Sequence, residues 1–127
     1  MLSRWQIACY IDDAGCQPVV EYMFDNKNET DLSVMIAVIQ RLSRVGLELV
    51  DTKMAKHIDG PIYELIKDRH RILFAEDAPK ARFVLLSAFL KETQKTPPEE
   101  IEKAHSYWKN YLRTENCEVF KIPVEDF

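Results

Sequence analysis

Apolar and polar residues alternate along this chain with two different periods, and the two periods predict strands and helices in turn. A period of two is typical of half-buried strands and occurs at residues 5–11 and 62–67. Two further apolar runs, at residues 72–75 and 83–90, flank a polar turn at 76–80 and therefore predict a β-hairpin.

A period near 3.6 residues predicts three helices. The first spans residues 18–26 and the second spans residues 31–45, each with an apolar stripe on one face. The third ends at residue 112, and it begins where Thr96 and Glu99 are spaced as a capping box around two prolines.

The predicted order is strand, helix, helix, three strands and helix, which defines an α+β fold. We expect a small, mainly antiparallel sheet with a helical hairpin packed on one face. Residues 49–57 are less regular and predict no element of their own. We expect one domain over residues 1–112 and a C-terminal tail at 113–127, in which residues 119–122 can add a short edge strand.

The composition is that of an ordinary globular domain, with 127 residues of which 46% are hydrophobic and 30% charged. No apolar run is long enough to span a bilayer and no signal segment opens the chain, so we expect a cytoplasmic protein with no membrane partner. The 3 cysteines match no zinc or redox spacing and the 3 histidines are scattered, so the sequence suggests no metal site.

Positive charge is concentrated in the centre of a chain whose formal net charge is −4. Residues 53–95 hold nine Lys and Arg against six Asp and Glu, so the remainder carries −7. The two open ends of a hairpin meet in space, and the cations that flank them are Lys67, Arg69, Arg71, Lys91 and Lys95. We predict that they form one rim that binds an anion, with an RNA phosphate favoured. A solvated sheet edge rich in lysine is the alternative explanation.

Three segments of this central block stand out: GPIYEL at 60–65, RHRILF at 69–74 and FLKETQKTP at 89–97, the last followed by an acidic helix start. With them the chain resembles the RelE/ParE superfamily of bacterial toxins, specifically its HigB-like, phage-related branch, roughly over residues 5–112. The resemblance implies a RelE-like fold and a toxin that cleaves messenger RNA in the ribosomal A site without a metal or cofactor. It also implies a helix-turn-helix antitoxin as partner.

Metal-free RNA cleavage uses the ribose 2′-OH as nucleophile and needs a base, an acid and positive charge around the phosphorane. By the resemblance, Arg71 matches the family's arginine and clamps the phosphate with its guanidinium fork. Histidines are suited to acid–base work near neutral pH. The expected catalytic residues are Arg71, Lys91 and Lys67, and the expected substrate-binding residues are Arg69, Lys95, His57 and His70.

The chain departs from the family pattern at two positions. Ile66 stands where the usual Glu-Leu-Arg has its arginine, and Glu92 stands where a second lysine is usual. A catalytically degenerate binding protein with the same fold is therefore an alternative to the toxin, either as a phage accessory protein or as a module that binds an acidic peptide. A gyrase-directed toxin of the ParE type is a third hypothesis, weaker because FLKETQKTP points to the HigB-like branch. The oligomeric state stays open.

Overall fold

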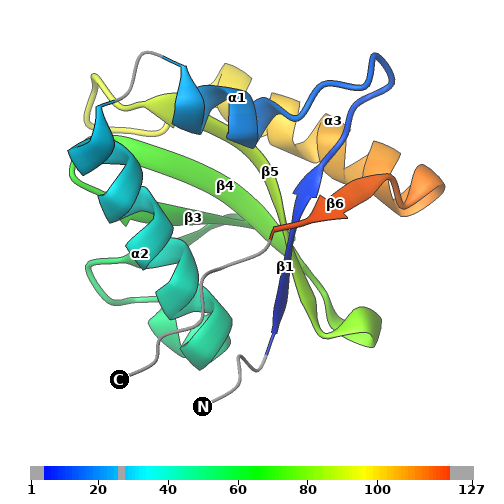
Figure 1. The fold of residues 1–127 in the computed structure, drawn as a ribbon, viewed down its shortest axis with the longest axis horizontal. Helices are drawn as coiled ribbons and strands as arrows, with labels where there is room; N and C mark the ends of the chain where they lie inside the picture. Colours follow the sequence, from blue (N-terminus) through cyan, green and yellow to red (C-terminus); the bar gives the residue numbers. More distant parts are fainter. Residues whose placement is uncertain (1–4, 26–27, 121–127) are drawn as a thin grey trace.

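The computed structural model describes residues 5–25 and 28–120, which contain six strands and three α-helices (Figure 1), together with two short 3-10 helices at Gly46–Leu49 and Ala78–Lys80. The predicted α+β class is confirmed. In chain order the elements are β1 (Gln6–Tyr10), α1 (Pro18–Phe24), α2 (Glu29–Val45), β2 (Ala55–Asp59), β3 (Ile62–Lys67), β4 (His70–Asp77), β5 (Arg82–Leu90), α3 (Pro98–Thr114) and β6 (Cys117–Val119).

The strands form one mixed sheet in the order β2-β3-β4-β5-β1-β6. Strands β2 to β5 make an antiparallel meander, in agreement with the short turns that join them. β1 pairs in parallel with β5, and β6 pairs antiparallel with β1. The hairpin of β4 and β5 therefore lies at the centre of the sheet.

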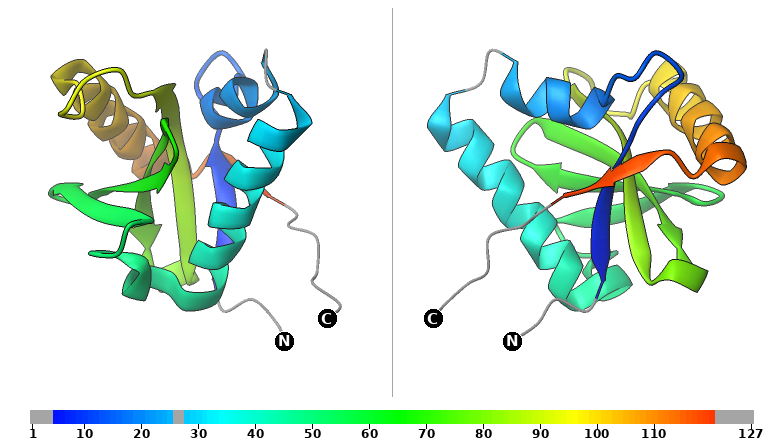
Figure 2. Two further views of the ribbon diagram at one scale, coloured as in Figure 1. Left: turned by 90° about the vertical axis from the view of Figure 1, so that its left-hand side faces the viewer. Right: turned by 45° about the vertical axis from the view of Figure 1, so that its right-hand side comes forward.

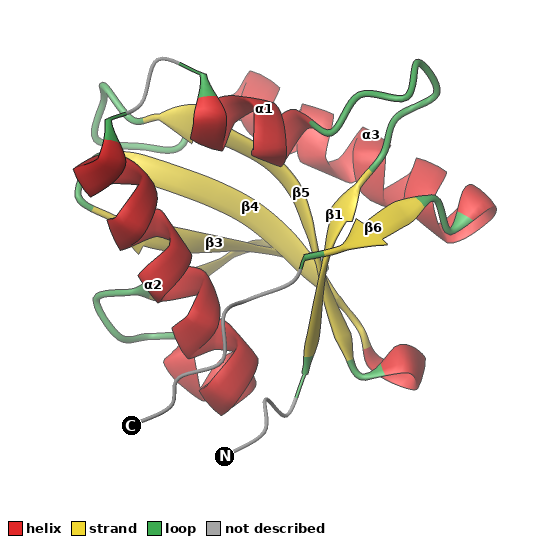
Figure 3. Ribbon diagram, viewed as in Figure 1, coloured by secondary structure: helices red, strands yellow, loops and turns green. Residues whose placement is uncertain are grey.

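Helices cover both faces of the sheet, with α1 and α2 on one face and α3 on the other (Figures 1 and 2). Figure 3 shows the sheet between these two helical layers. Successive residues of a strand point to opposite faces. Phe74 of β4 therefore belongs to the buried cluster that includes Met35 of α2, while its neighbour Leu73 belongs to the cluster that includes Ala104 of α3. The same alternation decides which polar side chains of the central strands share a face.

Two strands lie outside the predicted order. β2 has a single buried residue, Ala55, because an edge strand exposes its polar residues and shows no apolar period. The C-terminal edge strand is β6, which begins two residues before the segment expected at 119–122. Residues 121 and 122 of that segment lie outside the described residues.

The start of α3 differs from the predicted capping box. Pro97 occupies the cap position and makes no side-chain cap, so Thr96 does not cap the helix. The Thr96 hydroxyl instead donates a hydrogen bond to Oε2 of Glu64 on β3, at 2.8 Å. The α2 helix likewise begins two residues before Asp31, because the Asn28 side chain accepts a bond from the Asp31 amide at 2.7 Å.

Candidate functional site

The tight turn between β3 and β4 lies beside the end of β5. The amide of Lys91 donates to the carbonyl of Arg69 at 2.8 Å, and Nε of Arg69 donates to the carbonyl of Lys91 at 3.3 Å. Two positions further in, beyond the pair of His70 and Leu90, Arg71 pairs with Phe89 in the β4–β5 ladder. Antiparallel pairing therefore brings together cations that are about twenty residues apart in the chain, as the hairpin predicted.

These cations line a hollow of about 430 Å³. Its lining, which we call the cationic hollow, consists of Arg69, Arg71, Lys91, Glu92, Thr93 and Gln94. Three cations and one carboxylate give this surface a net positive charge, which favours an anionic ligand. The hollow unites three of the seven residues that the sequence singled out.

The Arg71 side chain is only 12% exposed and is already held by the protein. Its Nη1 donates to the carbonyls of Asp68 at 2.7 Å and His70 at 2.9 Å. Its Nε lies 3.8 Å from Oε1 of Glu64. A two-nitrogen grip on a phosphate through Nη1 and Nη2 would require Nη1 to leave these carbonyls.

Lys91 is a candidate proton acceptor in the hollow. Burial lowers the pKa of its ammonium group, and the neighbouring charges of Lys56 and Arg71 lower it further, while Glu64 acts in the opposite direction. A lowered lysine pKa increases the fraction of neutral amine at a given pH, which is what a general base requires.

Lys91 is expected to lose its proton at a lower pH than Lys80. Lys80 is a matched control because its hydrogen bond to Glu115 raises its pKa, whereas burial and like charges lower that of Lys91. The measurement is an NMR titration of the lysine Cε signals, assigned with Lys91→Arg and Lys80→Arg. If Lys91 titrates together with Lys80 or after it, the electrostatic description of the hollow is wrong.

A buried carboxylate, Glu64, lies behind the hollow and was not among the predicted site residues. Its side chain is fully buried, and Oε1 lies 3.8 Å from both Nζ of Lys56 and Nε of Arg71. The sequence indicated this residue only by its position: in a strand, Glu64 points to the same face as Ile62 and Ile66, where an apolar residue is expected. Lys56 was not among the predicted site residues because the sequence pattern did not predict strand β2.

Lys67 and His70 lie on the opposite face of the sheet from Arg71. They are cross-strand partners on the face that α1 and α2 cover. His70 is buried, with Nδ1 2.8 Å from the hydroxyl of Tyr22 and Nε2 3.6 Å from Oδ1 of Asp31. Lys67 therefore lies outside the predicted rim, and His70, which was expected to bind substrate, does not line the hollow, because strand alternation directs both side chains away from it.

His57 and Lys95 also lie outside the lining of the cationic hollow. Nε2 of His57 lies 2.8 Å from the carbonyl of Gly60, and its ring contacts Tyr63 edge to face at 5.2 Å. Lys95 is exposed, and its carbonyl accepts a hydrogen bond from Thr93 at 2.8 Å. The structure places Lys95 four residues beyond Lys91 in the segment before α3, so its predicted role remains a prediction.

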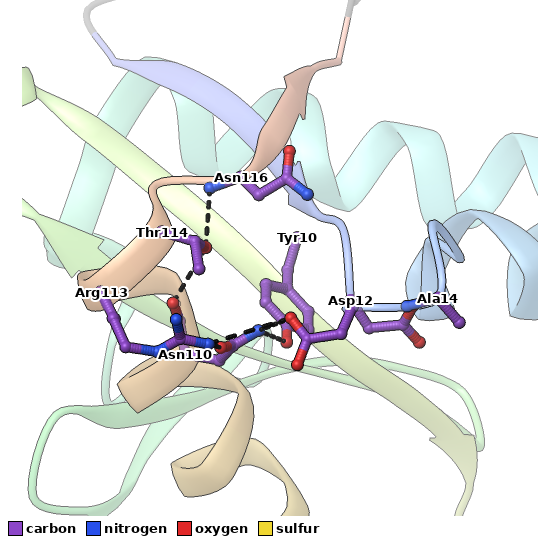
Figure 4. Close-up of polar contacts among 8 residues, drawn as sticks. Tyr10, Asp12, Ala14, Asn110, Arg113, Thr114 and Asn116 are labelled. Carbon is purple, nitrogen blue, oxygen red and sulfur yellow. Dashed lines mark hydrogen bonds and ion pairs between the residues drawn. The ribbon is translucent and has the colours of Figure 1, made fainter.

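A larger hollow, of about 600 Å³, lies between the loop after β1 and α3 (Figure 4). Its polar groups already bind one another: Nδ2 of Asn110 donates to Tyr10 at 2.6 Å and to Asp13 at 3.1 Å. Nη2 of Arg113 donates to Asn110 and lies 4.0 Å from Asp13. Because carboxylates and cations oppose each other here, an anionic substrate is favoured at the smaller, cationic hollow.

Within residues 5–25 and 28–120, no group of three or more His, Cys, Asp and Glu side chains is placed to hold a metal ion. Among the described helices, none combines the length and the apolar character needed to cross a bilayer.

Residues 23–109 match the model of a family described as phage-derived Gp49-like proteins (DUF891). The match covers more than half of the chain, and the chain therefore belongs to this family, which is RelE/toxin-like. The predicted phage-related character is confirmed, while the HigB-like branch remains a prediction. No curated protein matches the chain significantly. The matched range includes all residues of the cationic hollow, together with Lys56 and Glu64.

Proposed function

We propose that this chain is the toxin of a type II toxin–antitoxin system and acts as a ribosome-dependent mRNA endonuclease that needs no metal. The observation that carries the proposal is the convergence of Arg69, Arg71 and Lys91 on one hollow in a member of a toxin-like family. Its partners are the ribosome with bound mRNA and a helix-turn-helix antitoxin that blocks the site.

In this reaction the ribose 2′-OH attacks the adjacent phosphorus, so the O2′–P bond forms and the P–O5′ bond breaks. Lys91 accepts the proton of the 2′-OH, because burial and neighbouring cations lower its pKa and so increase the fraction of neutral amine. Arg71 and Arg69 stabilise the negative charge that develops on the phosphorane oxygens. The leaving 5′-oxygen takes up a proton from water, and Lys91 later releases its proton to water. The catalytic role predicted for Lys67 and the substrate-binding roles predicted for Lys95, His57 and His70 remain predictions.

Induction of the chain in a bacterium is expected to stop growth and to leave cuts within translated messages. The measurements are viable counts and mapping of RNA 5′ ends before and after induction. Co-expression of a helix-turn-helix protein encoded in the neighbouring reading frame is expected to restore growth. If the folded protein accumulates and growth continues without new RNA ends, the proposal fails.

One observation favours a second function, that of a non-catalytic binding protein on the same fold. Glu64 partly neutralises Arg71, whose Nη1 is occupied by two backbone carbonyls. Ile66 also replaces the arginine usual in the family. A degenerate protein of this kind would bind RNA or an acidic peptide and leave growth and translated messages intact, so the same induction experiment distinguishes the two functions.

A further inference from the structure

The buried carboxylate of Glu64 contacts three elements that meet at the cationic hollow. Lys56 reaches it from β2 and Arg71 from β4, both at 3.8 Å. Thr96, in the segment before α3, donates to its other oxygen at 2.8 Å. Burying a carboxylate is strongly unfavourable unless nearby cations and hydrogen bonds compensate for its lost hydration. Lys56, Arg71 and Thr96 supply that compensation to Glu64.

Glu64 fixes one side of the Arg71 guanidinium group. Nη1 is held by hydrogen bonds to the carbonyls of Asp68 and His70. Nε lies 3.8 Å from Oε1 of Glu64, beyond hydrogen-bond range, so this second restraint is electrostatic; among the described residues neither of these two buried atoms has a hydrogen-bond partner. The guanidinium group is planar, so restraining two nitrogens also fixes the third. Nη2 is then the nitrogen left for a ligand in the hollow that Arg71 lines.

The same carboxylate also anchors the opposite wall of the hollow. The segment 91–94 supplies Lys91, Thr93 and Gln94 to the lining. Its beginning is bound to Arg69 through the backbone, and its end is followed by Thr96, which binds Oε2 of Glu64. The Glu64 side chain on β3 thus contacts Arg71 in one wall and Thr96, which follows the other wall.

We propose that Glu64 is a positioning residue of this site: its charge holds Arg71 and the 91–96 segment in place and reduces the repulsion among the surrounding cations. The predicted effect of Glu64 on message cleavage rests on the proposed function, whereas its predicted effects on Arg71 and Lys91 do not. Glu64 acts through Arg71 and Lys91, and its charge partly offsets the effect of Lys56 and Arg71 on the proton affinity of Lys91.

The decisive variant is Glu64→Gln, which keeps the shape and an oxygen for Thr96 but removes the charge. The pKa of Lys91 is expected to fall further, as measured by NMR titration. The order parameter of the Arg71 Nε–H group is expected to fall toward the flexible range, below about 0.6. Message cleavage is expected to fall by about 100-fold, the effect of a small misplacement of a catalytic group.

Two further variants separate charge from packing. Glu64→Asp keeps the charge, so the Lys91 pKa is expected to stay nearer to that of wild type than in Glu64→Gln. Thr96→Val removes one hydrogen bond without changing charge, and it is expected to increase the mobility of residues 91–96 while Arg71 keeps its order parameter. Should Glu64→Gln be poorly folded, Thr96→Val still tests the proposal, because unchanged mobility of residues 91–96 in a folded Thr96→Val variant would contradict the anchoring role of Glu64.

If Lys91 and Arg71 give the same NMR results in Glu64→Gln as in wild type, the positioning role is wrong even when the wild-type chain is toxic. If the NMR results change as expected but the wild-type chain neither arrests growth nor cuts messages, the positioning role stands and the proposed function fails. The two failures are therefore distinguishable, because the NMR measurements need no cleavage.

Discussion

Arg71→Ala is expected to relieve growth arrest and to lower the rate of message cleavage by about 10²–10³-fold, the range for loss of one preorganised donor to a developing oxyanion. The reason is that Arg71 lines the cationic hollow with two of its nitrogens restrained, so its charge needs no reorganisation when the phosphorane forms. The measurements are viable counts after induction and the frequency of cut messages.

A matched control for this variant is Arg41→Ala, since Arg41 is exposed on α2, outside the lining of the cationic hollow. It is expected to stay as toxic as wild type. Removing Arg71 alone leaves the buried Glu64 with less compensation, which can cost about 3–5 kcal/mol. The double variant Glu64→Gln/Arg71→Ala avoids that charge, and full toxicity of a folded double variant would contradict the catalytic role of Arg71.

Phe74→Ala is expected to lower the free energy of unfolding by about 3–5 kcal/mol, the usual cost of deleting a fully buried aromatic side chain. Phe74 is 0% exposed at the centre of the sheet. Its ring stacks on Tyr63 and meets Phe83 edge to face, with both centroid distances 5.6 Å. The truncation therefore opens a cavity that neighbouring rings on fixed strands cannot close. The measurement is urea unfolding followed by circular dichroism.

Phe24→Ala is the control for this second prediction, because it makes the same chemical change at a side chain that is 60% exposed. It is expected to change the free energy of unfolding by no more than about 0.5 kcal/mol. Equal effects of the two substitutions would show that Phe74 does not occupy the core as described.

The sequence by itself determined those strands and helices that can be predicted from the pattern of apolar and polar residues within the element. The alternation at residues 62–67 coincides with β3, and the apolar run at 83–90 differs from β5 by one residue. Arg69, Arg71 and Lys91 were also predictable as neighbours, because an antiparallel hairpin aligns positions that follow from its turn. The membership of the chain in a toxin-like family agrees with the resemblance that these same segments carry.

Only the tertiary structure decided which side chains share the site. Strand alternation and the helices on each face place His70 under α1 and α2, away from Arg71. Lys56 and Thr96 reach Glu64 from elements that are distant in the chain, β2 and the start of α3. Local periodicity reports whether a residue is buried but not which distant residues it meets. The buried carboxylate behind the cationic hollow could therefore be recognised only after the sheet was assembled.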